Sequence, residues 1–420
     1  MNADVPRHTP GSIGAALSHR PFRWVFAGGF ASNIGTWMQN FTLAAFADAL
    51  TGKSWFIGLV IFAQLGPTLF LSPFGGVLAD TFDRKKLMIG AATVQTIFSL
   101  ALAVLVLDGH PNKYALVGLV AVIGVAGAAN APAANAVLPA LVGRRDIAGA
   151  ISLNSAQMNL SRVVGPLIAG LAIGIDHPSL IFTINAATYL FVIAAVAIVP
   201  FDSKPAAHSG DGPLERFRQG LAAARADQVI RRVLITVSVF SFCSLIFIYQ
   251  LAPFARKNLG GDSHTFTVVF SAFGLGAAIG AIAVGTFLVK VHRARLTRIG
   301  LLGFAVSLAA LSLQHTQRPA AIAAFLTGIF YFTVITSLST ILQEEVDDAV
   351  RGRVMGLWMM GWAGLVPLGS LIGGPIIDLV GLTTVFMFGA IVAVILAWYA
   401  DLRAPWEDEP LLVPEESFLE

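Results

Sequence analysis

Long apolar runs recur through the whole chain, and they limit how it can fold more than any other feature. About twenty apolar residues can cross a bilayer as one α-helix, because a helix satisfies its own backbone hydrogen bonds in hydrocarbon. The 420 residues contain twelve such runs. We interpret them as membrane spans at about 22–47, 56–79, 86–107, 115–139, 149–174, 179–200, 232–253, 265–289, 296–314, 319–342, 353–377 and 381–400.

The amino-acid composition also indicates a membrane protein. Hydrophobic residues make up 56% of the chain and charged residues only 12%, whereas about 25% of the residues of a soluble domain are charged. The predicted fold is therefore all-α and polytopic. The net charge of +3 does not indicate nucleic-acid binding, because the basic residues lie in loops rather than on one soluble face.

A single long polar segment divides the spans into six and six. Within this linker an amphipathic helix is predicted over Pro213–Ile230, with a proline in its first turn. Glycines flank a basic loop at the same spacing in each half, at Gly75 and Gly90 and at Gly285 and Gly300, which favours two six-helix repeats. The predicted units are an N-terminal tail at 1–21, a six-helix bundle at 22–200, the linker at 201–231, a second bundle at 232–402 and an acidic tail at 403–420.

The positions of Lys and Arg residues predict the orientation of the chain, because such residues gather in cytoplasmic loops. With a cytoplasmic N-terminus, 21 of the 27 Lys and Arg residues fall inside and five outside, and Arg162 lies within a span. The first twenty residues lack the apolar core of a signal peptide. We therefore expect both termini in the cytoplasm. Arg256 and Lys257 form a local exception on the outer side.

The sequence does not indicate an enzyme. It has no phosphate-binding loop of the full Gly-x-x-x-x-Gly-Lys-Ser/Thr type, and its eight histidines lie almost wholly in tails and loops. Its single cysteine, Cys243, lies inside an apolar run. We therefore expect no cofactor and no metal site.

Polar side chains inside the spans are the candidates for function, because each is costly in hydrocarbon. Arg162 lies on the order of 20 Å along its helix, too deep to reach the surface easily. Polar groups of this kind can also join helices together, so structural pairing and contact with a substrate or an ion remain equal alternatives for Arg162. The predicted substrate-cavity residues are Asn33, Trp37, Asn40, Gln64, Asn154, Gln157 and Arg162.

Two further features of the spans bear on movement and on coupling to protons. The pairs Gly165-Pro166 and Gly374-Pro375 predict helix bends, since proline removes a backbone donor. Carboxylates are scarce within the spans, and proton coupling usually needs one. Asp48, near the outer end of the first span, is the candidate, and an ordinary helix-end residue is the alternative.

A stretch between the second and third spans carries a family resemblance. The loop signature of the major facilitator superfamily is Gly-x-x-x-Asp followed by a basic cluster, and this chain resembles it at Gly76, Asp80, Arg84 and Lys86. Thr81 and Asp83 replace the usual basic residue and glycine.

Other segments resemble the enterobactin-exporter and macrolide-efflux branch of that superfamily. These segments are Asn33–Gln39, Ala79–Arg84, Arg162–Pro166 with Gly170, Arg351–Met355, and the linker helix running into Arg231 and Arg232. The resemblance covers about residues 15–402.

The resemblance implies the major facilitator fold and a secondary transporter that works by alternating access, with its spans in the inner membrane of a bacterium. Its expected activity is proton-coupled export of a small amphiphilic molecule such as a drug or a siderophore. It also implies that Asp80 pairs with Arg84 in a gating latch. A lysophospholipid flippase of the same fold and an uptake carrier remain alternatives. The expected partners are a small-molecule substrate, protons and the lipid bilayer, and the chain is expected to be a monomer.

Overall fold

A computed structural model describes residues 9–107, 111–173, 177–201, 213–288, 291–347 and 350–400. Within these ranges side chains are described except at residues 72–81, 159, 171–173, 213, 214 and 216. All regular elements of the described residues are helices. This confirms the predicted all-α class.

The first half of the chain forms one group of helices. Its elements are α1 (Ile13–Ser18), α2 (Arg20–Thr51), α3 (Ser54–Thr81), α4 (Arg84–Leu105), α5 (Lys113–Ala136), α6 (Leu138–Val142), α7 (Ile147–Leu167), the π-helix η1 (Ile168–Ile173) and α8 (Pro178–Ile198). Helix α2 packs on α7 and α8, and α4 packs on α5 and α8.

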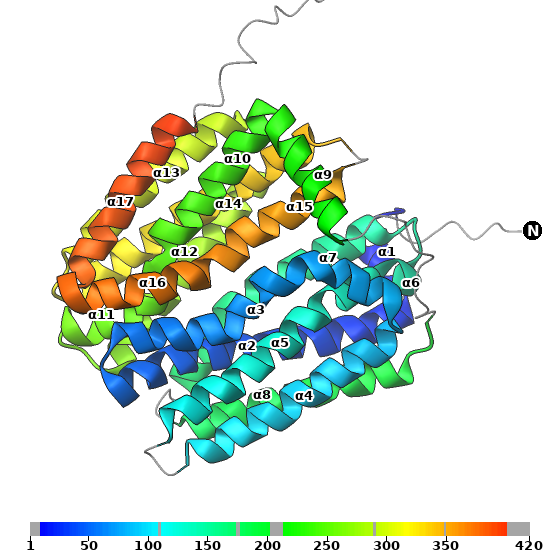
Figure 1. Cartoon of the computed structure of the whole chain (residues 1–420), viewed down its shortest axis with the longest axis horizontal. Coiled ribbons are helices and arrows are strands. Elements are labelled where there is room, and N and C mark those ends of the chain that lie inside the picture. The colour runs from blue at the N-terminus through cyan, green and yellow to red at the C-terminus, as the bar shows by residue number, and fades with distance from the viewer. Residues whose placement is uncertain are drawn as a thin grey trace, which may run out of the picture.

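The second half forms the other group. Its elements are α10 (Gln228–Val239), the π-helix η2 (Phe240–Ser244), the 3₁₀-helix η3 (Leu245–Gln250), α11 (Leu251–Lys257), α12 (Ser263–Thr286), α13 (Arg293–Ser312), α14 (Gln317–Glu345), α15 (Arg351–Met359), the π-helix η4 (Met360–Gly364), α16 (Leu365–Val380) and α17 (Leu382–Tyr399). Figure 1 shows the two groups one above the other, with the linker helix α9 (Pro213–Ala226) beside α15.

Ten helical segments of the described chain are long and apolar enough to cross a membrane. The remaining two predicted spans correspond to α2 and to α7 with η1, which are long but carry the polar stripes predicted from the sequence. The structure thus confirms a polytopic helical protein, and the count of twelve is confirmed for ten spans. Polar side chains on α2 and α7 lower their hydropathy, and these two helices pack on each other.

The linker helix is shorter than predicted. Helix α9 ends at Ala226, and α10 begins at Gln228 rather than near residue 232. The cause is Asp227, whose carboxylate accepts a hydrogen bond from the backbone nitrogen of Ile230 at 2.8 Å. Such a side chain caps the first turn of a new helix.

The N-terminal helix α1 is held against the start of α7 by one carboxylate. Asp146 accepts hydrogen bonds from the backbone nitrogen of Gly11 at 3.0 Å and from the His19 ring at 2.9 Å. The Gly11 bond, followed by the His19 bond, holds the pKa of Asp146 below its usual value. The tie therefore persists at neutral pH, and its stabilising effect is lost as the pH falls through that lowered pKa.

The two halves meet most closely where α3 lies along α16. A Cβ atom at Gly58 would overlap the carbonyl oxygen of Ser370, and one at Gly374 would lie 2.6 Å from the carbonyl oxygen of Ser54. Only glycine allows two helix backbones to approach this closely. We call this end of the molecule, where α2 ends and α3 begins, the distal end, and the end that carries α1 the proximal end (Figure 1).

Replacing Gly58 should destabilise the junction between the halves. We expect Gly58→Ala to lower the free energy of unfolding by about 1–3 kcal/mol, because the backbones must separate to admit the methyl group. The midpoint of unfolding in detergent measures the effect. Gly118→Ala in α5 is the matched control, since its Cβ would meet open space. Equal midpoints for the two variants would contradict the close packing of α3 on α16.

Candidate functional site

Arg162 lies at the interface between the halves, in the C-terminal part of α7. Aromatic rings surround its guanidinium group: the Cζ atom lies 5.2 Å from the ring centre of Trp37, 4.9 Å from that of Trp362 and 5.8 Å from that of Phe332. Trp37 belongs to the first half, and the other two rings belong to the second. Rings at this range attract a cation through their negative faces. We call Arg162 with these rings the arginine–aromatic site.

Both halves shape this site through local features of their helices. A Cβ atom at Gly165 would lie 2.7 Å from Cβ of Trp37, so the glycine lets α7 approach α2 one turn from Arg162. Trp362 lies in the π-helix η4, and its indole nitrogen donates a hydrogen bond to the hydroxyl of Tyr331 at 3.2 Å. Short π-helices often occur at functional sites.

The Gly-Pro pairs thus take part in helix packing. Pro166 lies inside α7, two residues before the π-helix η1, and Pro375 lies inside α16. Gly165 and Gly374 both stand at close approaches between helices. The bends predicted at these pairs remain a prediction.

The other cavity candidates lie on α2, α3 and α7, and most are paired. The amide of Gln64 donates to the side-chain oxygen of Asn40, and both residues are buried. Gln157 donates to the side-chain oxygen of Asn154 at 2.6 Å. No hydrogen-bond partner of Asn33 is recorded in the described part of the chain.

A buried polar network in the first half was not foreseen. The side-chain oxygen of Gln39 accepts hydrogen bonds from Asn185 at 2.8 Å and from Ser99 at 3.2 Å. Tyr189 joins the same network through Asn185 and Gln95. These residues lie on α2, α4 and α8, so the network fastens the helices of one half together. It is the helix-joining role that the sequence left open for polar residues.

Part of the predicted latch lies outside the described side chains. Gly76 and Asp80 belong to α3, but the structure does not describe the surroundings of Gly76 or the side chain of Asp80. Arg84 begins α4 and donates a hydrogen bond to the carbonyl of Ala136 at 3.1 Å. The backbone nitrogen of Lys86 donates to Asp83, which caps α4. The pairing of Asp80 with Arg84 remains a prediction.

Asp48 and Arg256 form an ion pair between the halves at the distal end. Both carboxylate oxygens accept from the guanidinium, at 2.7 and 2.9 Å. The Asp48 side chain is 6% exposed and that of Arg256 46% exposed. The pair explains why Arg256 occurs in a loop where the overall distribution of Lys and Arg disfavours a basic residue. The sequence had identified both residues but not their contact.

A second carboxylate at the distal end comes from the second half and contacts the first half. Asp378 of α16 accepts hydrogen bonds from the backbone nitrogens of Ser54 and Trp55, at 2.9 and 3.0 Å. It thereby caps the N-terminus of α3, where a negative charge also interacts favourably with the helix dipole. Phe41 and Phe266 stack across the same interface with ring centres 4.5 Å apart.

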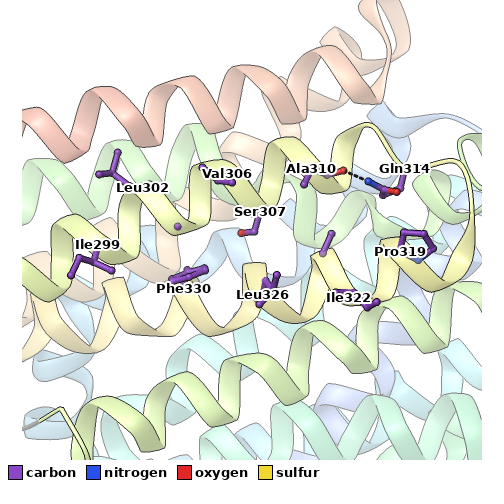
Figure 2. Close-up of a pocket in the computed structure, with 12 residues that line it drawn as sticks. Ile299, Leu302, Val306, Ser307, Ala310, Gln314, Pro319, Ile322, Leu326 and Phe330 are labelled. Atoms are coloured by element: carbon purple, nitrogen blue, oxygen red, sulfur yellow. Dashed lines mark hydrogen bonds between the residues drawn. The ribbon is translucent and has the colours of Figure 1, made fainter.

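A large surface groove lies away from this site, between α13 and α14 (Figure 2). Its volume is about 670 Å³, and its lining is almost wholly apolar. Val306 and Ile322 of the lining are 72% and 64% exposed, as expected of side chains that face lipid. The lining has no charged side chain, and its polar residues Ser307 and Gln314 donate hydrogen bonds to backbone carbonyls of their own helical region, so it offers few of the polar groups that a substrate site needs.

The sequence matches a known family over almost its whole length. The family described as transmembrane secretion effector matches residues 12–417. The chain therefore belongs to this family of major facilitator transporters, which are membrane proteins and not enzymes.

Curated relatives are similar over most of the chain. The staphyloferrin A transporter of Staphylococcus aureus is 25% identical over 373 residues, which is 87% of this chain and 91% of that protein. The enterobactin exporter of Escherichia coli is 25% identical over 346 residues, or 81% of each chain.

Solved structures share the fold. The nucleoside transporter NupG matches with a TM-score of 0.74 at 14% identity, over 91% of this chain and 98% of that one. A bacterial homologue of the lysosomal transporter Spinster matches with a TM-score of 0.72 at 15% identity, over 90% of this chain and 96% of that one. The predicted major facilitator fold is confirmed.

Breaking the Asp48–Arg256 pair should loosen the distal end. Thr267 is 1% exposed and packs against Gly170 of the other half, so a cysteine there reports on separation of the halves. In a Thr267→Cys, Cys243→Ser background, we expect Asp48→Asn to raise the thiol-labelling rate roughly fivefold, corresponding to about 1 kcal/mol for a partly exposed pair.

The control for this experiment is Lys53→Gln, which removes an exposed distal charge outside the pair. Labelling that rises equally in both variants would reflect general loosening. An unchanged rate in Asp48→Asn would contradict a closing role for the pair.

Proposed function

We propose that this chain is a proton-driven exporter of small amphiphilic molecules, which moves its substrate by alternating access between the two halves. The observation that supports this proposal is the arginine–aromatic site, in which side chains from both halves surround the guanidinium of Arg162. A ligand that contacts both halves can bind their two arrangements with different affinity, as alternating access requires. The names of the two curated relatives, a transporter and an exporter, support this reading.

We propose that the protein lies in a bacterial inner membrane with its proximal end and both termini on the cytoplasmic side. The excess of Lys and Arg in the proximal loops supports this orientation. The distal end then faces outward. Its two carboxylate contacts and the Phe41–Phe266 stack would hold the outer side closed in the arrangement described here.

Coupling to protons is proposed at Asp48. Its carboxylate is buried and holds Arg256 across the interface. Protonation would remove the negative charge and weaken the pair, so a proton arriving from outside would favour opening of the outer side. An ion pair that spans two moving bodies can in this way make their movement depend on pH.

Export and its coupling can be tested together. Comparison of the metabolites secreted by a deletion strain and its parent identifies the substrate, and everted membrane vesicles then measure its uptake. We expect uptake to require an imposed pH gradient and to stop when a proton ionophore dissipates it. Asp48→Asn should abolish the dependence on pH while the protein remains in the membrane. Uptake that is indifferent to the gradient would exclude proton coupling.

The latch proposal concerns the proximal end. If Asp80 stabilises the arrangement in which the cytoplasmic side is closed, removal of its charge should slow the return to that arrangement. We expect Asp80→Asn to lower the export rate roughly tenfold or more without loss of protein from the membrane. The matched control is Asp83→Asn, which removes a charge three residues away and keeps a residue able to cap α4. Equal export by the two variants would refute a specific latch at Asp80.

A further inference from the structure

The guanidinium of Arg162 carries a charge that the described part of the chain does not neutralise. The ion pairs Asp48–Arg256 and His19–Asp146 do not include Arg162, and no carboxylate of the described residues pairs with it. Its Nε atom is buried without a hydrogen-bond partner. A buried charged donor left without an acceptor is costly, and the cost is large at membrane depth.

The surrounding rings reduce this cost but do not remove it. Trp37, Phe332 and Trp362 stabilise the cation through their electron-rich faces. They offer no acceptor to the N–H groups, which extend from the guanidinium in its own plane. The side chain as a whole is only partly buried, so a ligand has access to it.

Tyr331 supplies a second donor beside the arginine. Its oxygen accepts the hydrogen bond from Trp362, which leaves the hydroxyl hydrogen available for another partner. Tyr331 is 7% exposed, and its ring stacks on Phe273 with centres 5.9 Å apart, so its position is fixed by packing. Trp362 contacts both groups, since its ring lies 4.9 Å from the Arg162 guanidinium and its indole nitrogen bonds the Tyr331 hydroxyl.

We propose that Arg162 and Tyr331 bind the anionic group of the transported molecule, and that Trp37, Phe332 and Trp362 contact an aromatic or otherwise flat apolar part beside it. The substrate class is therefore a small organic anion such as an aromatic carboxylate. This inference rests on the proposed function and adds that the transported molecule is negatively charged. A carboxylate matches the guanidinium geometrically and forms charge-assisted hydrogen bonds with it.

Binding of small probes tests the inference on the purified full-length protein. Benzoate, benzamide and cyclohexanecarboxylate are titrated at pH 7.5 by calorimetry, with chloride as a competitor. We expect benzoate to bind roughly tenfold more tightly than benzamide, which has the same shape without the charge. It should also bind more tightly than cyclohexanecarboxylate, which has the charge without the aromatic ring.

Variants assign the discrimination to individual side chains. Arg162→Gln should abolish the preference for benzoate over benzamide, and Arg162→Lys should retain part of it. Tyr331→Phe should weaken benzoate binding several-fold and leave benzamide unchanged. Trp362→Leu should reduce the preference for benzoate over cyclohexanecarboxylate. Circular dichroism verifies that each variant is folded. If Arg162→Gln does not fold, the partial loss of the benzoate preference in Arg162→Lys still tests the inference.

Each result separates this inference from the proposed function. A preference for benzoate that persists in Arg162→Gln, or complete displacement of benzoate by chloride at equal concentration, overturns the anion site even if vesicles export a substrate. Arginine-dependent binding of benzoate by a protein that transports nothing in vesicles supports the anion site and overturns the transporter proposal. Export of a neutral substrate at equal rates by the wild type and Arg162→Gln also overturns the anion site.

Discussion

Hydrocarbon offers no hydrogen-bond partners, and this constraint determines where the polar side chains of the chain lie. Within the first half several of them form hydrogen bonds with one another, as in the contacts of Gln39 with Ser99 and Asn185. The pair formed by Asn40 and Gln64 joins α2 to α3 in the same way. Arg162 is different because its neighbours are rings from both halves rather than acceptors within one half. Polar groups with partners in the same half therefore hold that bundle together, whereas Arg162 lies at the junction of the two bundles.

The distal end illustrates how two bundles can be joined without becoming one rigid body. Asp48 reaches from the first half to Arg256, and Asp378 reaches from the second half to the start of α3. Both are contacts of a carboxylate with positive charge or helix dipole, which competing water can replace as the ends separate. The close packing of Gly58 on α16 is steric and short-ranged. Separation at the junction would break these contacts and leave the polar network within the first half intact.

The sequence predicted the fold well because apolar length and loop charge are local properties. It also identified Arg162, since one arginine within an apolar run is conspicuous on its own. It also placed Trp37 with Arg162 among the cavity candidates, and the structure brings the two together. It could not identify the rings of the other half, because Phe332 and Trp362 lie far along the chain from Arg162. Asp48 and Arg256 were each noticed as exceptions to a pattern. Their pairing depends on the packing of α2 against α11, which no local pattern encodes.

The composition of the arginine–aromatic site bears on why the two halves would move together with a substrate. An unneutralised guanidinium is tolerated while part of it reaches water, and it becomes more costly as the site closes and the local dielectric falls. A bound anion reverses this balance, since its attraction to the cation strengthens as water is excluded. The occupied site would then close more readily than the empty one. Because Trp37 and Trp362 belong to different halves, such closure requires the halves to approach each other around the ligand.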